Sequence, residues 1–196
     1  MKNFLGILLC ILVASCSKTE NQPGNYDGLY DFEQVTGGNH YTYLVPVVHS
    51  PISKESFVSA VKGKAWESSA VYKLRTDKSV ISAVDLGEYP GMTSRIAFSD
   101  NGSQATFYAL DLRGYETEKF SYEPSNGGID FTYLWFSSFS GNGRLVYLSS
   151  STMVLVCTHD KDSKGENLIF MEILNRVPDS TLATWQKSCT HKGINE

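Results

Sequence analysis

The stretch KFSYEPSNGGIDFTYLW, residues 119–135, holds the pattern that decides the fold. Phe120 and Tyr122 alternate with polar residues, and a turn follows at PSNGG. Large side chains then resume at every second position, at Ile129, Phe131, Tyr133 and Trp135. A period of two indicates strands with one buried face, and the asparagine-glycine pair favours a tight turn. The stretch therefore predicts an antiparallel β-hairpin.

The same two-residue period extends through most of the chain on both sides of this hairpin. It begins at Trp66, after a short helix that we expect between an N-cap at Ser53 and a stop at Gly63. It ends before a second helix that begins near Pro178 and Asp179. About eight short antiparallel strands joined by tight turns are typical of a β-barrel or a β-sandwich. We therefore predict an all-β domain with one helix at each end.

The first 15 residues are typical of a targeting segment. Lys2 is followed by an apolar run over residues 4–13, which is shorter than the roughly 20 residues that cross a bilayer. The sequence VASC, residues 13–16, resembles the lipobox of bacterial lipoproteins. That resemblance implies that Cys10 is discarded and that Cys16 becomes an N-terminus acylated with fatty acids such as palmitate. The alternative is an ordinary secretory signal peptide cut near the same place.

An acylated Cys16 would make the membrane a partner of the protein, because two or more acyl chains anchor stably. Ser17 beside the anchor resembles lipoproteins of the outer membrane, so we expect a cell-envelope location, with the periplasmic and surface faces both open. The domain organisation that follows is a signal peptide at 1–15, a tether at 16–28, a lead-in segment at 29–52 and the β-barrel domain at 53–196.

Composition excludes some function classes. The chain has 17 basic and 21 acidic residues, a formal charge of −4, and no block of lysine and arginine with interleaved aromatics. We therefore expect no binding to nucleic acid. The chain suits one domain, which we expect to be a monomer. Motifs for a nucleophile elbow, a zinc protease or a phosphate loop are missing from the sequence, so we expect neither an enzyme nor a cofactor.

Two cysteines remain after the targeting segment, Cys157 and Cys189. Because exported proteins meet an oxidising environment, this pair predicts a disulfide, with two unpaired buried thiols as the alternative. The four histidines lack the spacing of metal ligands, so we expect no metal site. Glu116 and Glu118 share one face of a strand, and we expect both to be exposed to solvent.

Residues 53–190 resemble the lipocalin and lipocalin-like β-barrels, in particular the small lipocalin-like lipoproteins of Bacteroidetes-type bacteria. The resemblance rests on Gly63, on Trp66 opening the first strand, on Arg176 closing the last strand, and on the strand pattern between them. It implies an up-and-down barrel of about eight strands. It also implies that Trp66 lies at the closed barrel floor, with Arg176 packed over its ring in a cation–π contact.

The interior of such a barrel is either filled by side chains or open to one small ligand. The residues that the pattern places inward, and that we expect to line a ligand site, are Tyr72, Phe98, Phe107, Phe120, Tyr122, Phe131, Tyr133 and Trp135. We therefore expect a binder of a small apolar or amphipathic molecule. The alternative is an envelope protein that contacts a glycan or a partner protein through the aromatic stretch FTYLWFSSF, residues 131–139.

Overall fold

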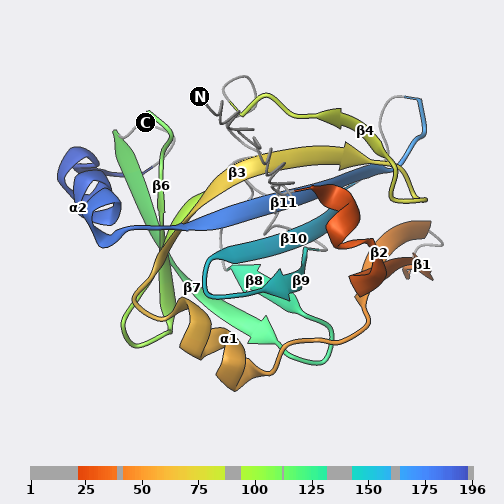
Figure 1. The fold of residues 1–196 in the computed structure, drawn as a ribbon, viewed down its shortest axis with the longest axis horizontal. Helices are drawn as coiled ribbons and strands as arrows, with labels where there is room; N and C mark the ends of the chain where they lie inside the picture. Colours follow the sequence, from red (N-terminus) through yellow and green to blue (C-terminus); the bar gives the residue numbers. More distant parts are fainter. Residues whose placement is uncertain are drawn as a thin grey trace, which may run out of the picture.

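β3 (Ala65–Leu74) closes the sheet into a barrel, because it pairs with β5 (Arg95–Phe98) on one edge and with β11 (Leu168–Val177) on the other. The strands between them are, in order, β6 (Gln104–Tyr108), β7 (Gly114–Glu123), β8 (Gly128–Phe131), β9 (Arg144–Leu148) and β10 (Thr152–His159). The computed structural model describes residues 22–38, 42–86, 94–111, 113–131, 143–159 and 164–193. Within these ranges the eight strands form a closed antiparallel barrel (Figure 1), which confirms the predicted fold class.

Both predicted helices are present. α1 (Lys54–Val61) begins where the Ser53 hydroxyl accepts a hydrogen bond from the Ser56 backbone N–H at 3.1 Å. It is followed by Gly63, whose φ of +65° is strained for other residues and whose Cβ would lie 2.6 Å from a carboxylate oxygen of Asp100. α2 (Asp179–Ser188) packs on the outside of the barrel, where Trp185 is 3% exposed. Neither helix of the described residues has the length and hydrophobicity needed to span a bilayer.

Further strands lie outside the closed barrel. β4 (Val80–Ala83) pairs with the end of β3, and β12 (His191–Lys192) runs parallel to β7. β1 (Tyr30–Thr36) and β2 (Thr42–Val48) pair only with each other, so β2 tolerates Pro46 as an edge strand does. Two 3-10 turns, η1 (Pro23–Asn25) and η2 (Asp27–Leu29), precede this hairpin.

Residues 23–38 and 42–49, which we call the N-terminal cover, pack on the outer face of β9, β10 and β11. Tyr26, Tyr30 and Val48 are at most 7% exposed, and they share one apolar cluster with outward-facing residues of these strands. The outward-facing residues are Val146, Val154, Val156, Ile169, Met171 and Ile173. Part of the predicted tether, from Pro23, and the described part of the predicted lead-in segment are therefore packed against the barrel.

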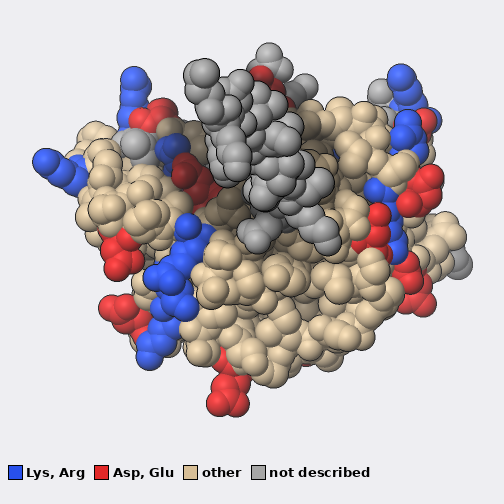
Figure 2. All heavy atoms as spheres, viewed as in Figure 1, with Lys and Arg blue, Asp and Glu red and all other residues tan. Residues whose placement is uncertain are grey.

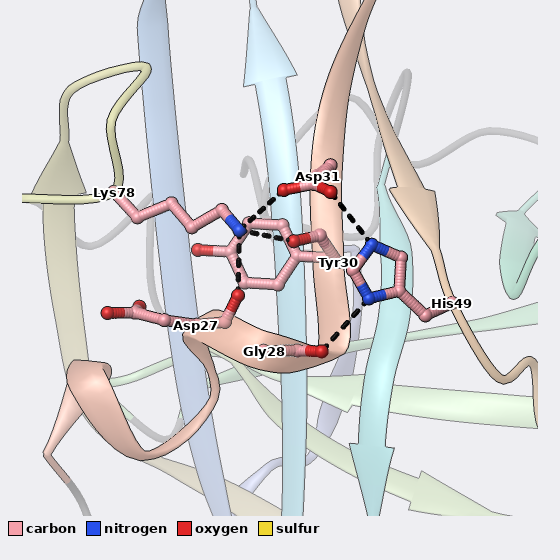
Figure 3. A network of polar contacts seen from close by, with 6 residues as sticks. All are labelled: Asp27, Gly28, Tyr30, Asp31, His49 and Lys78. Carbon is pink, nitrogen blue, oxygen red and sulfur yellow. Dashed lines mark hydrogen bonds and ion pairs between the residues drawn. The ribbon is translucent and has the colours of Figure 1, made fainter.

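Lys78 fastens the N-terminal cover to the barrel (Figure 3). Its ammonium group donates to the carbonyl oxygens of Asp27 and Tyr30 at 2.7 and 2.6 Å and to Oδ1 of Asp31 at 2.6 Å. His49 lies on the other side of Asp31, with Nε2 2.9 Å from Oδ2 and Nδ1 2.9 Å from the Gly28 carbonyl oxygen. The hydrogen bond from Lys78, followed by that from His49, lowers the pKa of Asp31. The network joins the turn after β3 to η2, to β1 and to the residue that follows β2.

Replacing Lys78 with methionine is expected to loosen the N-terminal cover. The change leaves two backbone carbonyls without their charged donor, and such hydrogen bonds contribute about 1.5–3 kcal/mol. We expect a loss of that size in the free energy of urea unfolding and faster proteolytic cleavage within residues 22–50. Lys64→Met is the matched control, since Lys64 reaches only one carbonyl oxygen, at 3.5 Å. Unchanged proteolysis of Lys78→Met would show that the apolar cluster alone holds the cover.

Candidate functional site

The end of the barrel next to α1 is filled by aromatic side chains. Phe57 of α1 stacks on Tyr122, with ring centroids 4.3 Å apart, and makes edge contacts with Phe98 and Phe120 at 6.0 Å. Phe107 belongs to the same cluster and is 4% exposed. Burial raises the pKa of the Tyr122 hydroxyl. Four of the expected ligand contacts are therefore part of the packed core at this closed end.

Trp66 lies in this core, and Arg176 does not. The indole is 0% exposed and shares its cluster with Phe57 and Val61 of α1. Arg176 is the cross-strand partner of Trp66 in the β11–β3 register, but its side chain is exposed. Among the described residues Arg176 makes no cation–π contact with the indole, so that expectation was wrong. The helix supplies apolar cover at the floor, and the guanidinium group stays in water.

Tyr72 faces out of the barrel, contrary to the sequence pattern. Ile173 pairs with Ala70 while Leu174 pairs with Ser68, so Ser69 is an extra residue in β3. This bulge reverses the alternation, because one unpaired residue moves every later side chain to the other face. Tyr72 consequently packs under the N-terminal cover. Of the remaining expected contacts, Tyr133 and Trp135 lie outside the described residues, as does the side chain of Phe131 and most of the aromatic stretch at 131–139.

The half of the interior away from α1 has a different lining. After the bulge, Val71 points inward together with Cys157 of β10 and Phe170 of β11. These three are at most 7% exposed, with the partly buried Val84, Leu86 and Leu168 packed against them. His159 follows on the same face of β10, where its ring contacts Phe170 with centroids 5.8 Å apart and its Nε2 lies 3.4 Å from the Cys157 sulfur.

A carboxylate lies between the two halves of the interior. Glu172 is 0% exposed and alternates with Ile173, which faces the N-terminal cover, so its side chain points inward. One carboxylate oxygen accepts a hydrogen bond from the Ser68 hydroxyl, and that hydroxyl accepts one from the Ser94 backbone N–H at 2.5 Å. We call Ser68, Ser94 and Glu172 the polar niche. Ser94 is 2% exposed, and its hydroxyl has no hydrogen-bond partner in the described part of the chain.

The polar niche is costly for the fold. A buried polar group without a partner costs about 1–3 kcal/mol, and nearly all such groups in native proteins are paired with protein, water or ligand. Glutamate is almost never fully buried unless it is paired. Within the niche, the Ser94 hydroxyl carries such a cost in the described part of the chain.

Acidic side chains also face the interior from the opposite wall. Glu118 pairs with the inward-facing Ala105 and Glu116 pairs with the inward-facing Phe107, so both carboxylates point into the barrel. Glu118 is 6% exposed, which corrects the expectation that it is solvated. In the strand order β7 lies across the barrel from β3 and β11, as Figure 1 shows. On the outside, by contrast, basic and acidic side chains are interspersed around the margin of the face shown in Figure 2.

Cys157 and Cys189 are not linked. No disulfide joins them and both thiols are buried, so the predicted disulfide was wrong and its alternative is what the structure shows. Cys157 packs inside the barrel beside Val71, whereas Cys189 packs outside it beside Ala65. Six residues of β3 separate these two contacts, roughly 20 Å along a strand, whereas a disulfide needs Cα atoms within about 7 Å. Burial raises the pKa of the Cys189 thiol.

Sequence reasoning missed Glu172 and Ser94 as site residues. The signal for Glu172 is visible in LIFMEIL, residues 168–174, where one carboxylate interrupts an otherwise apolar strand. No comparable signal marks Ser94, because serine is common on exposed strand ends. Only the pairing of β5 with β3 brings Ser94 next to Ser68 and into the barrel interior.

Solved structures similar to this chain include two of bovine odorant binding protein. No protein-family model and no curated protein matches the chain. A deswapped triple mutant of bovine odorant binding protein is 18% identical, with a TM-score of 0.35 over 65% of this chain and 83% of that chain. The complex of bovine odorant binding protein with a selenium-containing odorant is 16% identical, with a TM-score of 0.34 over 66% of this chain and 80% of that chain. Because the identities and TM-scores are low, what these proteins bind is not transferred to this chain, and any ligand is inferred from the residues of this chain.

Proposed function

We propose that the protein binds a small amphipathic molecule inside the barrel, in the half away from α1. The observation that carries this proposal is the change in lining along the barrel axis. Aromatic rings fill the closed end, whereas the other half combines the apolar Val71, Cys157 and Phe170 with the buried carboxylates of Glu172 and Glu118. A mainly apolar wall with a few placed polar groups is typical of small-molecule sites.

Titration with N-phenyl-1-naphthylamine, an uncharged fluorescent amphiphile, tests this function. A guest that buries about 300 Å² of apolar surface gains several kcal/mol before ordering costs, which corresponds to micromolar affinity at best. Val71→Phe is expected to weaken binding by at least about tenfold, because the larger side chain overfills the site at a cost of about 1–3 kcal/mol. Saturable binding to the wild type that this variant weakens would support the proposed site.

Ala83→Phe is the matched control for this experiment. Ala83 lies on β4 opposite Tyr72, and its side chain is exposed on the outside of the barrel. The same change in size there is expected to leave probe affinity within about twofold, since surface substitutions have small effects. If wild type fails to bind the probe, or if both variants bind it equally well, the interior site is ruled out.

We also propose that the domain is held at a membrane of the cell envelope by acylation of Cys16, in the manner of outer-membrane lipoproteins. The support is the VASC sequence after an apolar run, with Ser17 beside the cysteine. Residues 1–21 lie outside the described part of the chain. Since the N-terminal cover begins at Pro23, the anchor would be joined to the folded domain by only a few residues.

A further inference from the structure

The polar niche contains a hydroxyl group that the fold leaves unused. Ser94 lies two residues before the inward-facing Ile96, so its side chain points into the barrel toward the wall that carries Ser68 and Glu172. It is 98% buried, and its hydroxyl has no hydrogen-bond partner among the residues described. A buried polar group of this kind is nearly always paired in native proteins, so the Ser94 hydroxyl is open to a hydrogen bond from water or from an atom of a guest.

The charge around the polar niche is mainly negative. Glu172 belongs to the niche, and Glu116 and Glu118 face the interior from the opposite wall. Lys73 is the described lysine that faces inward, because it pairs with the inward-facing Phe170. His159 lies near it, in the half of the interior away from α1. Among the residues that the structure describes, three carboxylates against one lysine make the interior favourable for a cation, since an unpaired charge of the same sign would be repelled.

Resting on the proposed function, we propose that the polar niche selects ligands that carry a protonated amine on an apolar body. An ammonium group has three donors and no acceptor, and it meets the carboxylate of Glu172 and the hydroxyl oxygen of Ser94. The apolar body lies against Val71, which pairs directly with Glu172, and against Phe170, two residues further along β11. Charge-assisted hydrogen bonds are stronger than neutral ones. Among ligands with the same apolar tail, the head group therefore determines the order of binding affinity.

The test is competition against bound N-phenyl-1-naphthylamine with n-octylamine, 1-octanol and octanoate at pH 7.4, where the amine is protonated. We expect n-octylamine to bind about tenfold tighter than 1-octanol, with octanoate weakest. Glu172→Gln is expected to remove most of the advantage of the amine and to change the affinity for 1-octanol by less than about threefold. Ser94→Ala is expected to weaken the amine by about threefold. Glu33→Gln, at an exposed position of β1, is the matched control and should leave the ranking unchanged.

The outcomes separate the two proposals. If octanoate or 1-octanol binds wild type as tightly as n-octylamine, or if folded Glu172→Gln keeps the full preference for the amine, amine selection is wrong while the interior site remains. If neither the fluorescent probe nor any of the three competitors binds, the interior site itself is wrong. The wild-type ranking needs no substitution, so it decides the question even if Glu172→Gln does not fold.

Discussion

Replacing Phe57 with alanine is expected to lower the free energy of unfolding by about 3–5 kcal/mol, the usual cost of removing a large buried aromatic side chain. Phe57 is 0% exposed and contacts the rings of Phe98, Phe120 and Tyr122. Together with Val61, it is a side chain through which α1 packs into the barrel core. A domain of this size has about 5–15 kcal/mol of total stability, so the variant would be close to unfolding at physiological temperature.

Urea unfolding followed by tryptophan fluorescence measures this loss. Val80→Ala is the control, because Val80 is 44% exposed on β4 and its truncation is expected to change stability by at most about 0.5 kcal/mol. An unchanged slope with a lower midpoint would show that native stability fell and that the unfolded state did not change. A loss below about 1 kcal/mol for Phe57→Ala would mean that α1 is not part of the barrel core.

The closed barrel was predictable because its strands obey local rules. The alternation in residues 119–131 is kept in β7 and β8, and the hairpin turn falls where asparagine and glycine place it. The caps of α1 were also predictable, since Ser53 and Gly63 act within one turn of chain. These features depend on neighbours in the sequence.

The face of Tyr72 could not be predicted, because it depends on pairing between β3 and a strand about one hundred residues later. The single extra residue at Ser69 is defined only by the register with β11. If the two-residue alternation is continued from Trp66 to Leu74, the predicted inward and outward faces are correct before the bulge and exchanged after it. Half of the inner wall of β3 was therefore assigned to the wrong face.

The apolar runs of β10 and β11 have a related explanation. TMVLVCTH and LIFMEIL show little alternation, because these strands are buried on both faces. Their inner face lines the barrel, and their outer face lies under the N-terminal cover. Strands that are covered on both sides are apolar almost throughout. An apolar run without alternation does not indicate which residues face inward. The inward orientation of Glu172 therefore followed only from the position of the N-terminal cover on the other face.

The disulfide was predicted from the compartment and not from geometry. An oxidising environment permits the bond, but the bond also requires two side chains on the same side of one wall. Cys157 lies inside the barrel and Cys189 lies outside it. Sequence separation carries no information on which side of a sheet a cysteine lies, so only the fold could decide between a disulfide and two thiols.

Replacing Cys16 with serine is expected to move the protein almost entirely from the membrane fraction to the soluble fraction of a bacterial host. Acyl chains contribute about 0.8 kcal/mol for each buried CH₂ group, so two or more chains anchor a protein stably and their removal abolishes that anchor. The serine variant lacks the thiol that we propose is acylated. It should also fail to incorporate radiolabelled palmitate.

Cys10→Ser is the matched control, since Cys10 lies in the apolar run that the lipoprotein interpretation discards. This variant should still incorporate palmitate and sediment with membranes after a carbonate wash. If Cys16→Ser also remains on washed membranes, the domain is held there by something other than an acyl chain. If wild type is already soluble and unlabelled, the lipoprotein interpretation is wrong and an ordinary secretory signal is the better account of residues 1–15.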